Sequence, residues 1–117
     1  MEEAKIVKTS EISIKVGLNE NNLPIGMKWT ATDGNIENES AKAILLSLWD
    51  PKENNTMRID LWTKDMTIDE MKQFFHQTLI TMADSFEKAT GETNICEDLR
   101  DYCIHFADKM NILPEEN

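Results

Sequence analysis

The chain has 117 residues, of which 40% are hydrophobic and 29% charged, and its formal net charge is −10 at pH 7. This length suits one domain with one hydrophobic core, so we expect a single domain over residues 1–117 with its ordered core at about 8–112. The acidic excess excludes a nucleic-acid partner, because binding phosphates requires lysine and arginine, and it equally disfavours an anionic membrane surface.

The N-terminal segment, residues 1–8, has neither the basic start nor the apolar run of a secretory signal. The longest apolar run of the chain, Ala43–Leu46, is far shorter than the ~20 residues of a membrane-spanning helix. We therefore expect neither a secretory signal nor direct membrane insertion.

The first half of the chain has the period-two pattern of strands. Ile12, Ile14 and Val16 alternate with polar residues, which predicts a half-buried strand. A turn-rich loop follows at 17–24, and the alternation resumes over 25–31. The simplest outcome is a second strand antiparallel to the first.

An acidic stretch from Asp33 to Glu39 interrupts the strand pattern. Its oxygen-bearing side chains alternate along the chain, as they do in a calcium-binding loop. An EF-hand loop would need glycine at the sixth position and glutamate at the twelfth, where Asn38 and Ile44 stand. The sequence favours a solvated acidic loop and leaves open whether this loop binds a cation.

The segment Ala41–Leu48 fits either a strand or a short helix. We interpret Ala43–Trp49 and Thr56–Trp62 as a hairpin, because the turn-forming residues 50–55 separate them. Alternation in the second strand predicts a core-facing set, Met57, Ile59 and Leu61. The outward-facing set is then Arg58, Asp60 and Trp62.

Helical spacing begins after Lys64. Thr67 and Glu70 form a capping-box pattern, and Gly91 is a natural helix end. An apolar stripe at helical spacing runs between them: Ile68, Met71, Phe74, Phe75, Leu79, Met82 and Phe86. A second helix is predicted from Asn94 as its N-cap to a stop at Pro114, with residues 115–117 frayed.

Burial of this stripe cannot offset the entropy of ordering an isolated helix, so the stripe needs a broad apolar surface to pack on. The sequence therefore predicts the α+β class, with an antiparallel sheet of about four strands followed by two helices packed on one face.

No catalytic or nucleotide-binding motif is present, and we predict no catalytic residue, cofactor or metal site. His76 and His105 stand at the edge of the helical stripes or off them, without a polar partner. Cys96 and Cys103 lie seven residues apart, about 10.5 Å along a helix, so they are too distant for a disulfide. Free thiols fit a reducing compartment.

Trp62 is the main candidate for a partner surface, together with Arg58 and Asp60 on the same strand side. A tryptophan on the sheet face away from the helices would expose a large apolar area, as partner surfaces do, although a neighbouring loop or the N-terminal arm could cover it. Ile80 and Ile104 lie on the flanks of the two helices and are further candidates for the partner surface, because they could meet each other or a second subunit. Isolated exposed apolar residues are also ordinary.

Four stretches of the sequence resemble the gliding motility-associated GldC family: KTSEISIKVGL at 8–18, WTATDG at 29–34, SLWD at 47–50, and RIDLWTKDM at 58–66 continuing through DEMKQFFHQT at 69–78. The resemblance implies a cytoplasmic, non-enzymatic accessory protein of the gliding apparatus. Its partner would be a protein of that apparatus or of the linked secretion system.

Two other functions compete with this one. Strands followed by two helices in an acidic protein resemble SecB-type chaperones, which bind unfolded or exported chains, but this is an analogy at the level of fold. A small enzyme or ligand binder would require a deep cavity lined by convergent polar groups.

Overall fold

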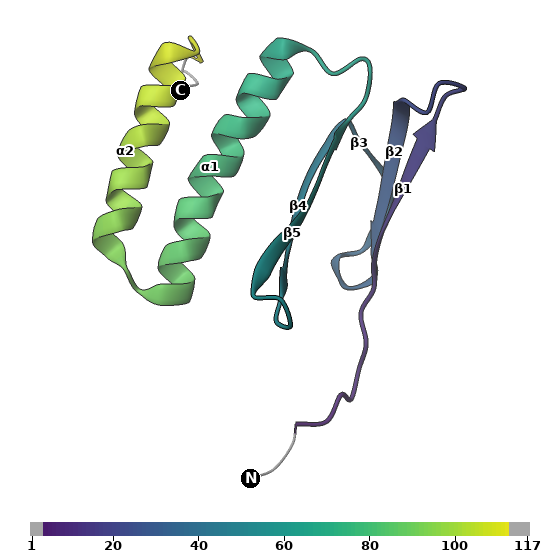
Figure 1. Cartoon of the computed structure of the whole chain (residues 1–117), viewed down its shortest axis with the longest axis horizontal. Helices are drawn as coiled ribbons and strands as arrows, with labels where there is room; N and C mark the ends of the chain where they lie inside the picture. Colours follow the sequence, from purple (N-terminus) through teal and green to yellow (C-terminus); the bar gives the residue numbers. More distant parts are fainter. Residues whose placement is uncertain (1–3, 113–117) are drawn as a thin grey trace. The chain divides into compact units, whose positions relative to one another are not determined.

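A computed structural model gives the structure of residues 4–112 (Figure 1). The chain divides into two compact units between Met66 and Thr67, the first built from strands and the second from helices. The predicted α+β class is confirmed, with antiparallel strands followed by two helices. The elements in chain order are β1 (Ile12–Leu18), β2 (Pro24–Ala31), the 3-10 helix η1 (Thr32–Gly34), β3 (Ile36–Ala41), β4 (Ala43–Asp50), β5 (Asn55–Trp62), α1 (Ile68–Thr90) and α2 (Thr93–Lys109).

Within residues 4–112 the strands form two sheets, and not the single sheet of about four strands that we expected. One sheet has the order β1-β2-β3, and the other pairs β4 with β5. All neighbouring strands are antiparallel. The packing of the helices on one sheet face stays a prediction, as does the single domain over 1–117.

The three-stranded sheet is amphipathic, as the period-two pattern predicted. Its register sets Ile14 of β1 opposite Trp29 of β2, and Val16 opposite Met27. Met27 is buried and Trp29 is partly buried, so the core of the first unit lies on this face. The opposite face carries polar side chains, among them Ser13, Lys15, Lys28 and Thr30.

The acidic stretch that we expected to be a loop is mostly strand β3. Ser40 and Glu39 pair with Lys28 and Trp29 of β2, and the Lys28 Nζ lies 3.2 Å from the Ser40 Oγ. Asn38 adopts a left-handed backbone with φ of 52°, beside an irregularity in the register. An outer strand can be polar on both sides because it has few neighbours to pack against, so hydrophobic alternation gave no signal here.

The ambiguous segment Ala41–Leu48 is strand apart from a bend at Lys42, and β4 pairs with β5 around a tight turn. The Asp50 Oδ1 accepts a hydrogen bond from the Lys52 backbone N–H at 3.0 Å. The prediction that Met57 and Ile59 are buried in the core is wrong, because both side chains are half exposed. A sheet of two strands provides too little surface to cover either of its own faces.

The predicted capping box of α1 is confirmed. The Thr67 Oγ1 accepts from the Glu70 backbone N–H at 3.0 Å, and the Glu70 Oε1 accepts from the Thr67 N–H at 2.9 Å. Gly91 ends the helix with φ of 74°, and its N–H donates to the Glu87 carbonyl at 2.8 Å. Glycine suits this position because it has no Cβ to oppose a left-handed backbone.

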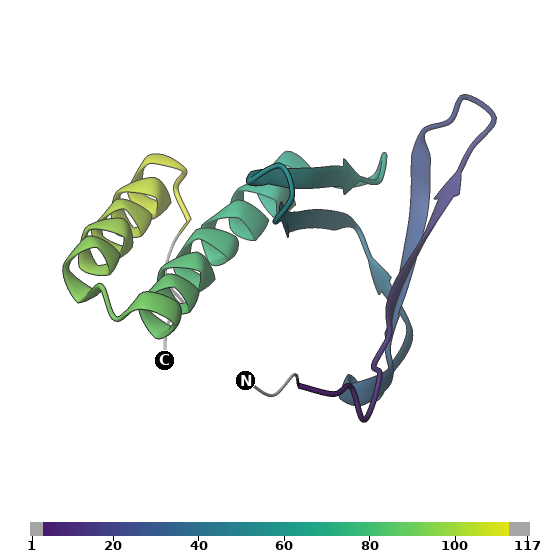
Figure 2. The ribbon, with the colours of Figure 1, turned by 60° about the horizontal axis from the view of Figure 1, so that its bottom comes forward.

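The second helix begins slightly earlier than predicted. Glu92 is the N-cap of α2, and Asn94 lies inside its first turn. The Thr90 Oγ1 accepts from the Glu92 backbone N–H at 3.1 Å, so the short connection to α1 fixes this start. The two helices run side by side as an antiparallel hairpin (Figure 2). The predicted end at Pro114 and the frayed tail lie outside the described residues.

Arg100 of α2 joins the two helices through three carboxylates. Its guanidinium donates to Glu87 at 2.6 Å and to Asp84 at 2.9 Å on α1, and to Glu97 at 2.7 Å on its own helix. These hydrogen bonds raise the pKa of Arg100 and lower that of Glu87. The charged form of Glu87 therefore stabilises the folded hairpin.

The capping box predicts that Thr67→Ala destabilises the protein by about 1 kcal/mol, since the N–H of Glu70 loses its acceptor. Urea denaturation followed by far-UV circular dichroism measures this effect. Thr81→Ala is the matched control: its exposed hydroxyl donates to a carbonyl inside α1, and alanine favours helix, so stability stays equal or rises. Equal losses at the two positions would contradict the capping role.

We predict that Glu87→Gln destabilises the protein in a pH-dependent way. The pKa of Glu87 lies below its ordinary value of 4.5 because Arg100 hydrogen-bonds the carboxylate. Its contribution is therefore complete above that value and lost as the pH falls through the lowered pKa. The urea midpoints of the two proteins should differ at neutral pH and converge in acid. Glu97→Gln, which changes a more exposed partner of Arg100, should have a smaller effect; a pH-independent gap for Glu87→Gln would oppose this account.

Candidate functional site

Two exposed tryptophans lie on one face of the β4–β5 hairpin. The register sets Trp62 opposite Ala43 and Trp49 opposite Thr56. Because side chains alternate along a strand, these residues share one side of the sheet. Trp49 is 62% exposed and Trp62 53% exposed. We call this side the tryptophan face; its members are Ala43, Leu45, Ser47, Trp49, Thr56, Arg58, Asp60 and Trp62.

The tryptophans stand at opposite ends of this face. From Thr56, the partner of Trp49, to Trp62 is six residues, or roughly 20 Å at about 3.3 Å per residue. Arg58 and Asp60 lie between the two ends and are exposed. The face thus has an indole at each end and one charge of each sign between them.

Backbone hydrogen bonds fix the Trp62 end of the hairpin to the β3–β4 connection and to β2. The Thr63 N–H donates to the Lys42 carbonyl at 2.8 Å, and the Lys64 N–H donates to the Pro24 carbonyl at 3.1 Å. The buried hydroxyl of Thr63 donates to Asp65 at 2.6 Å. Trp62 therefore projects from a strand end held on both sides, as a preformed binding site requires.

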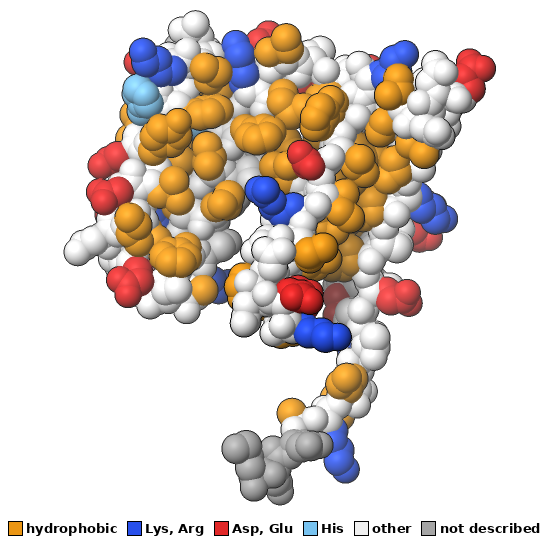
Figure 3. All heavy atoms as spheres, viewed as in Figure 1, with side chains coloured by type: hydrophobic (Ala, Val, Ile, Leu, Met, Phe, Trp, Pro, Cys, Tyr) orange, Lys and Arg blue, Asp and Glu red, His pale blue; other side chains and the backbone are white. Residues whose placement is uncertain are grey.

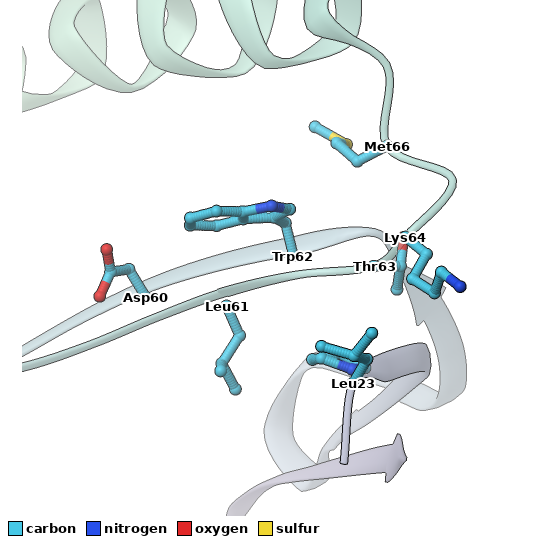
Figure 4. A pocket seen from close by; sticks show the side chains of 8 residues that line it. Leu23, Asp60, Leu61, Trp62, Thr63, Lys64 and Met66 are labelled. Atoms are coloured by element: carbon cyan, nitrogen blue, oxygen red, sulfur yellow. The ribbon is translucent and has the colours of Figure 1, made fainter. Parts of the chain in front are cut away.

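A shallow apolar pocket of about 330 Å³ surrounds this strand end (Figure 4). Trp62 and Leu61 project to opposite sides of the strand, Trp62 on the side of Met66 and Leu61 on the side of Leu23. Asp60 and Lys64 are the charged residues of the lining. This composition suits an apolar side chain of a partner better than a reacting substrate. The lining residues are Leu23, Pro24, Asp60, Leu61, Trp62, Thr63, Lys64 and Met66.

The structure brings together three of the five predicted surface residues. Arg58, Asp60 and Trp62 share the tryptophan face. Ile80 and Ile104 belong to the second unit: Ile80 is partly exposed on α1, and Ile104 is strongly exposed on α2. Trp62 itself is 53% exposed, so within residues 4–112 neither a loop nor the N-terminal arm covers it.

Sequence reasoning missed Trp49 and Leu45 as members of this face. The necessary signal was present in the predicted hairpin. Pairing 43–49 with 56–62 around the turn sets Ala43 opposite Trp62, and period two then places Leu45 and Trp49 on the same side. We did not predict which side chains of 43–49 point outward, because this segment was also compatible with a helix.

The titratable residues considered for chemistry hold structural positions. The His76 Nε2 lies 3.1 Å from the Cys103 carbonyl oxygen, and its ring stacks on Phe106. In the acidic stretch, Asp33 pairs with Lys8 at 3.4 Å and accepts a hydrogen bond from Ser10. Within residues 4–112, no cluster of three or more histidine, cysteine or acidic side chains has the arrangement of a metal site.

Cys96 and Cys103 are free thiols buried in the helical hairpin. Burial raises the pKa of both, because the charged thiolate loses its hydration. A raised pKa lowers the thiolate fraction at neutral pH and makes a nucleophile poorer. The two cysteines therefore act as small core residues.

Comparison with known proteins gives one family. A family model described as "Gliding motility-associated protein GldC-like" matches residues 24–112, which include the whole tryptophan face and both helices. The N-terminal stretch 8–18 lies outside the match. No curated protein and no solved structure matches the chain. Within residues 4–112, no helix is long and apolar enough to cross a bilayer.

Buried thiols predict slow modification. In the native protein at about pH 8, Cys96 and Cys103 should react with a disulfide reagent at least ~10-fold more slowly than in urea, since burial limits both access and ionisation. Ser85→Cys adds a thiol at an exposed position of α1 and serves as the fast-reacting control. Native rates equal to that of the added thiol would show that these cysteines are not core residues.

Proposed function

The chain belongs to the GldC-like family of gliding motility-associated proteins, and we propose that it is a non-enzymatic accessory protein that binds another protein of the gliding apparatus through its tryptophan face. The single observation that supports this most strongly is the exposure of Trp62 and Trp49 on one side of the hairpin. Tryptophan and arginine are the residues most enriched where protein interfaces concentrate their binding energy.

The geometry of the face suggests the chemistry of its partner. A segment lying along it would place one apolar side chain at each indole, and charged or polar side chains opposite Arg58 and Asp60. The pocket beside Trp62 has room for one of these apolar anchors. The strand end held by Thr63 keeps Trp62 ordered before binding, which reduces the entropy cost of association.

The absence of enzymatic activity is part of the proposal. The two histidines and two cysteines already occupy packed positions on the helices or lie beside aromatic rings. A general base would instead stand in a pocket within reach of a substrate proton. We also place the protein in the cytoplasm, as the family resemblance implies and as two free thiols favour.

A chaperone-type binder of unfolded chains is the second candidate. It is favoured by the other side of the same hairpin, where Leu48, Met57 and Ile59 are each half exposed. Such a protein would bind many unfolded sequences with similar affinity, whereas an accessory protein would select one folded partner.

Site-specific crosslinking in gliding cells tests the proposal. A photoreactive residue at position 58 should capture one motility or secretion-system protein, because Arg58 lies at the centre of the tryptophan face. The same probe at Lys15, on the polar side of the other sheet, should capture none. With the captured protein purified, Trp62→Ala should weaken binding by about 30-fold or more, which corresponds to ~2 kcal/mol for a central tryptophan.

Lys15→Ala is the matched binding control and should leave affinity unchanged. Equal crosslinking from positions 58 and 15, or full affinity in both Trp62→Ala and Trp49→Ala, would refute the assignment of this face. Competition by assorted unfolded chains would favour the chaperone candidate instead.

A further inference from the structure

The main apolar stripe of α1 is not the side of α1 that packs on α2. His76, Asp84 and Glu87 of α1 make hydrogen bonds to α2, and Ala83 on this side of the helix is buried. At about 100° per residue, these residues lie between a quarter turn and a half turn around the helix from the stripe. The stripe residues Ile68, Phe75, Met82 and Phe86 are each more than 40% exposed.

The second helix extends this apolar surface. Ile95, Leu99, Tyr102 and Phe106 recur at steps of four, three and four, so they form a stripe along one side of α2. Hydrophobic side chains gather over both helices in Figure 3. We call the combined surface the helical face; its members are Ile68, Met71, Phe75, Leu79, Met82 and Phe86 of α1, and Ile95, Leu99, Tyr102 and Phe106 of α2.

Two hollows mark the ends of the helical face. The first has a volume of about 240 Å³ and is lined by Ile68, Met71, Lys72, Phe75 and Phe106. The second has a volume of about 340 Å³ and is lined by Phe86, Ile95, Cys96, Asp98 and Leu99. Each hollow contains one charged side chain, a lysine in the first and an aspartate in the second.

This arrangement is self-complementary. On α1, Lys72 lies seven residues before Leu79, and Phe86 lies seven residues after Leu79. Phe86 lines the same hollow as Asp98 of α2. A two-fold axis that is perpendicular to α1 at Leu79 and lies in the plane of the helical face would therefore set the lysine end of one face against the aspartate end of a second. A single such operation forms two identical ion pairs, which is the signature of an isologous dimer interface.

We propose that the helical face binds a second copy of this chain about that axis, with Lys72 of each copy against Asp98 of the other. Phe86 of each copy would fill the hollow beside Lys72 of the other. The proposal is independent of the proposed function, since it concerns the other unit and another occupant.

The charge distribution favours a second copy as the occupant. With one lysine and one aspartate, the helical face with its two hollows is neutral, whereas the chain carries −10 in total. Two acidic molecules repel each other over most of their surfaces. They can approach through a neutral apolar surface whose two charges are paired by the contact.

Charge reversal tests the dimer. Wild-type protein should sediment at twice its 13.5 kDa mass, and Lys72→Glu or Asp98→Lys alone should raise the dimer dissociation constant at least ~10-fold, because each places two pairs of like charges in contact. An equimolar mixture of the two variants should dimerise again, since the heterodimer has two attractive pairs. Within one chain the two positions lie about 21 Å apart along the helices, so restoration requires contact between chains.

Restoration in the mixture also shows that both variants are folded. Ile104→Ser is the matched control, an exposed apolar residue of α2 outside the helical face, and should dimerise like wild type. A wild-type protein that stays monomeric, or a mixture that does not dimerise, overturns the proposal and leaves the chain's own strands or another protein as the occupant. Neither result tests whether a partner binds at Trp62, so the dimer proposal and the proposed function can be refuted independently.

Discussion

The helical hairpin is held together by small residues. The buried apolar residues described in it are Ala83, Cys96 and Cys103, and all three have short side chains. Short side chains between helices allow close backbone approach, so one shared cluster, Arg100 with its carboxylates, can span the contact. The bulky apolar residues then lie on the open sides. The helical face that we propose for dimerisation is a consequence of how this contact is filled.

Local structure was largely predictable because its causes are local. The capping box at Thr67 and the left-handed Gly91 depend on residues within one turn, and both were found. Strand β3 was missed because its polar residues pair with β2 through the backbone, which leaves no hydrophobic period to detect. The α2 cap was misplaced because the short connection from Gly91, and not the best capping side chain, determines where the helix begins.

The candidate site was only partly predictable, because periodicity identifies a face but not what covers it. Alternation placed Trp62 correctly with Arg58 and Asp60. It also assigned Met57 and Ile59 to a core, although they are half exposed in a sheet of two strands. The exposed helical stripe shows the same limit. Whether an apolar side is core or interface depends on distant partners, which residue spacing does not encode.

The left-handed backbone positions have a chemical consequence of their own. Among residues 4–112, the non-glycine residues with positive φ are all asparagines: Asn22, Asn35, Asn38, Asn54 and Asn111. An asparagine loses less backbone entropy on folding than a glycine would at the same corner. None of the five is followed by glycine, the neighbour that most accelerates succinimide formation. The chain therefore gains stiff corners while avoiding the sites most prone to spontaneous deamidation with age.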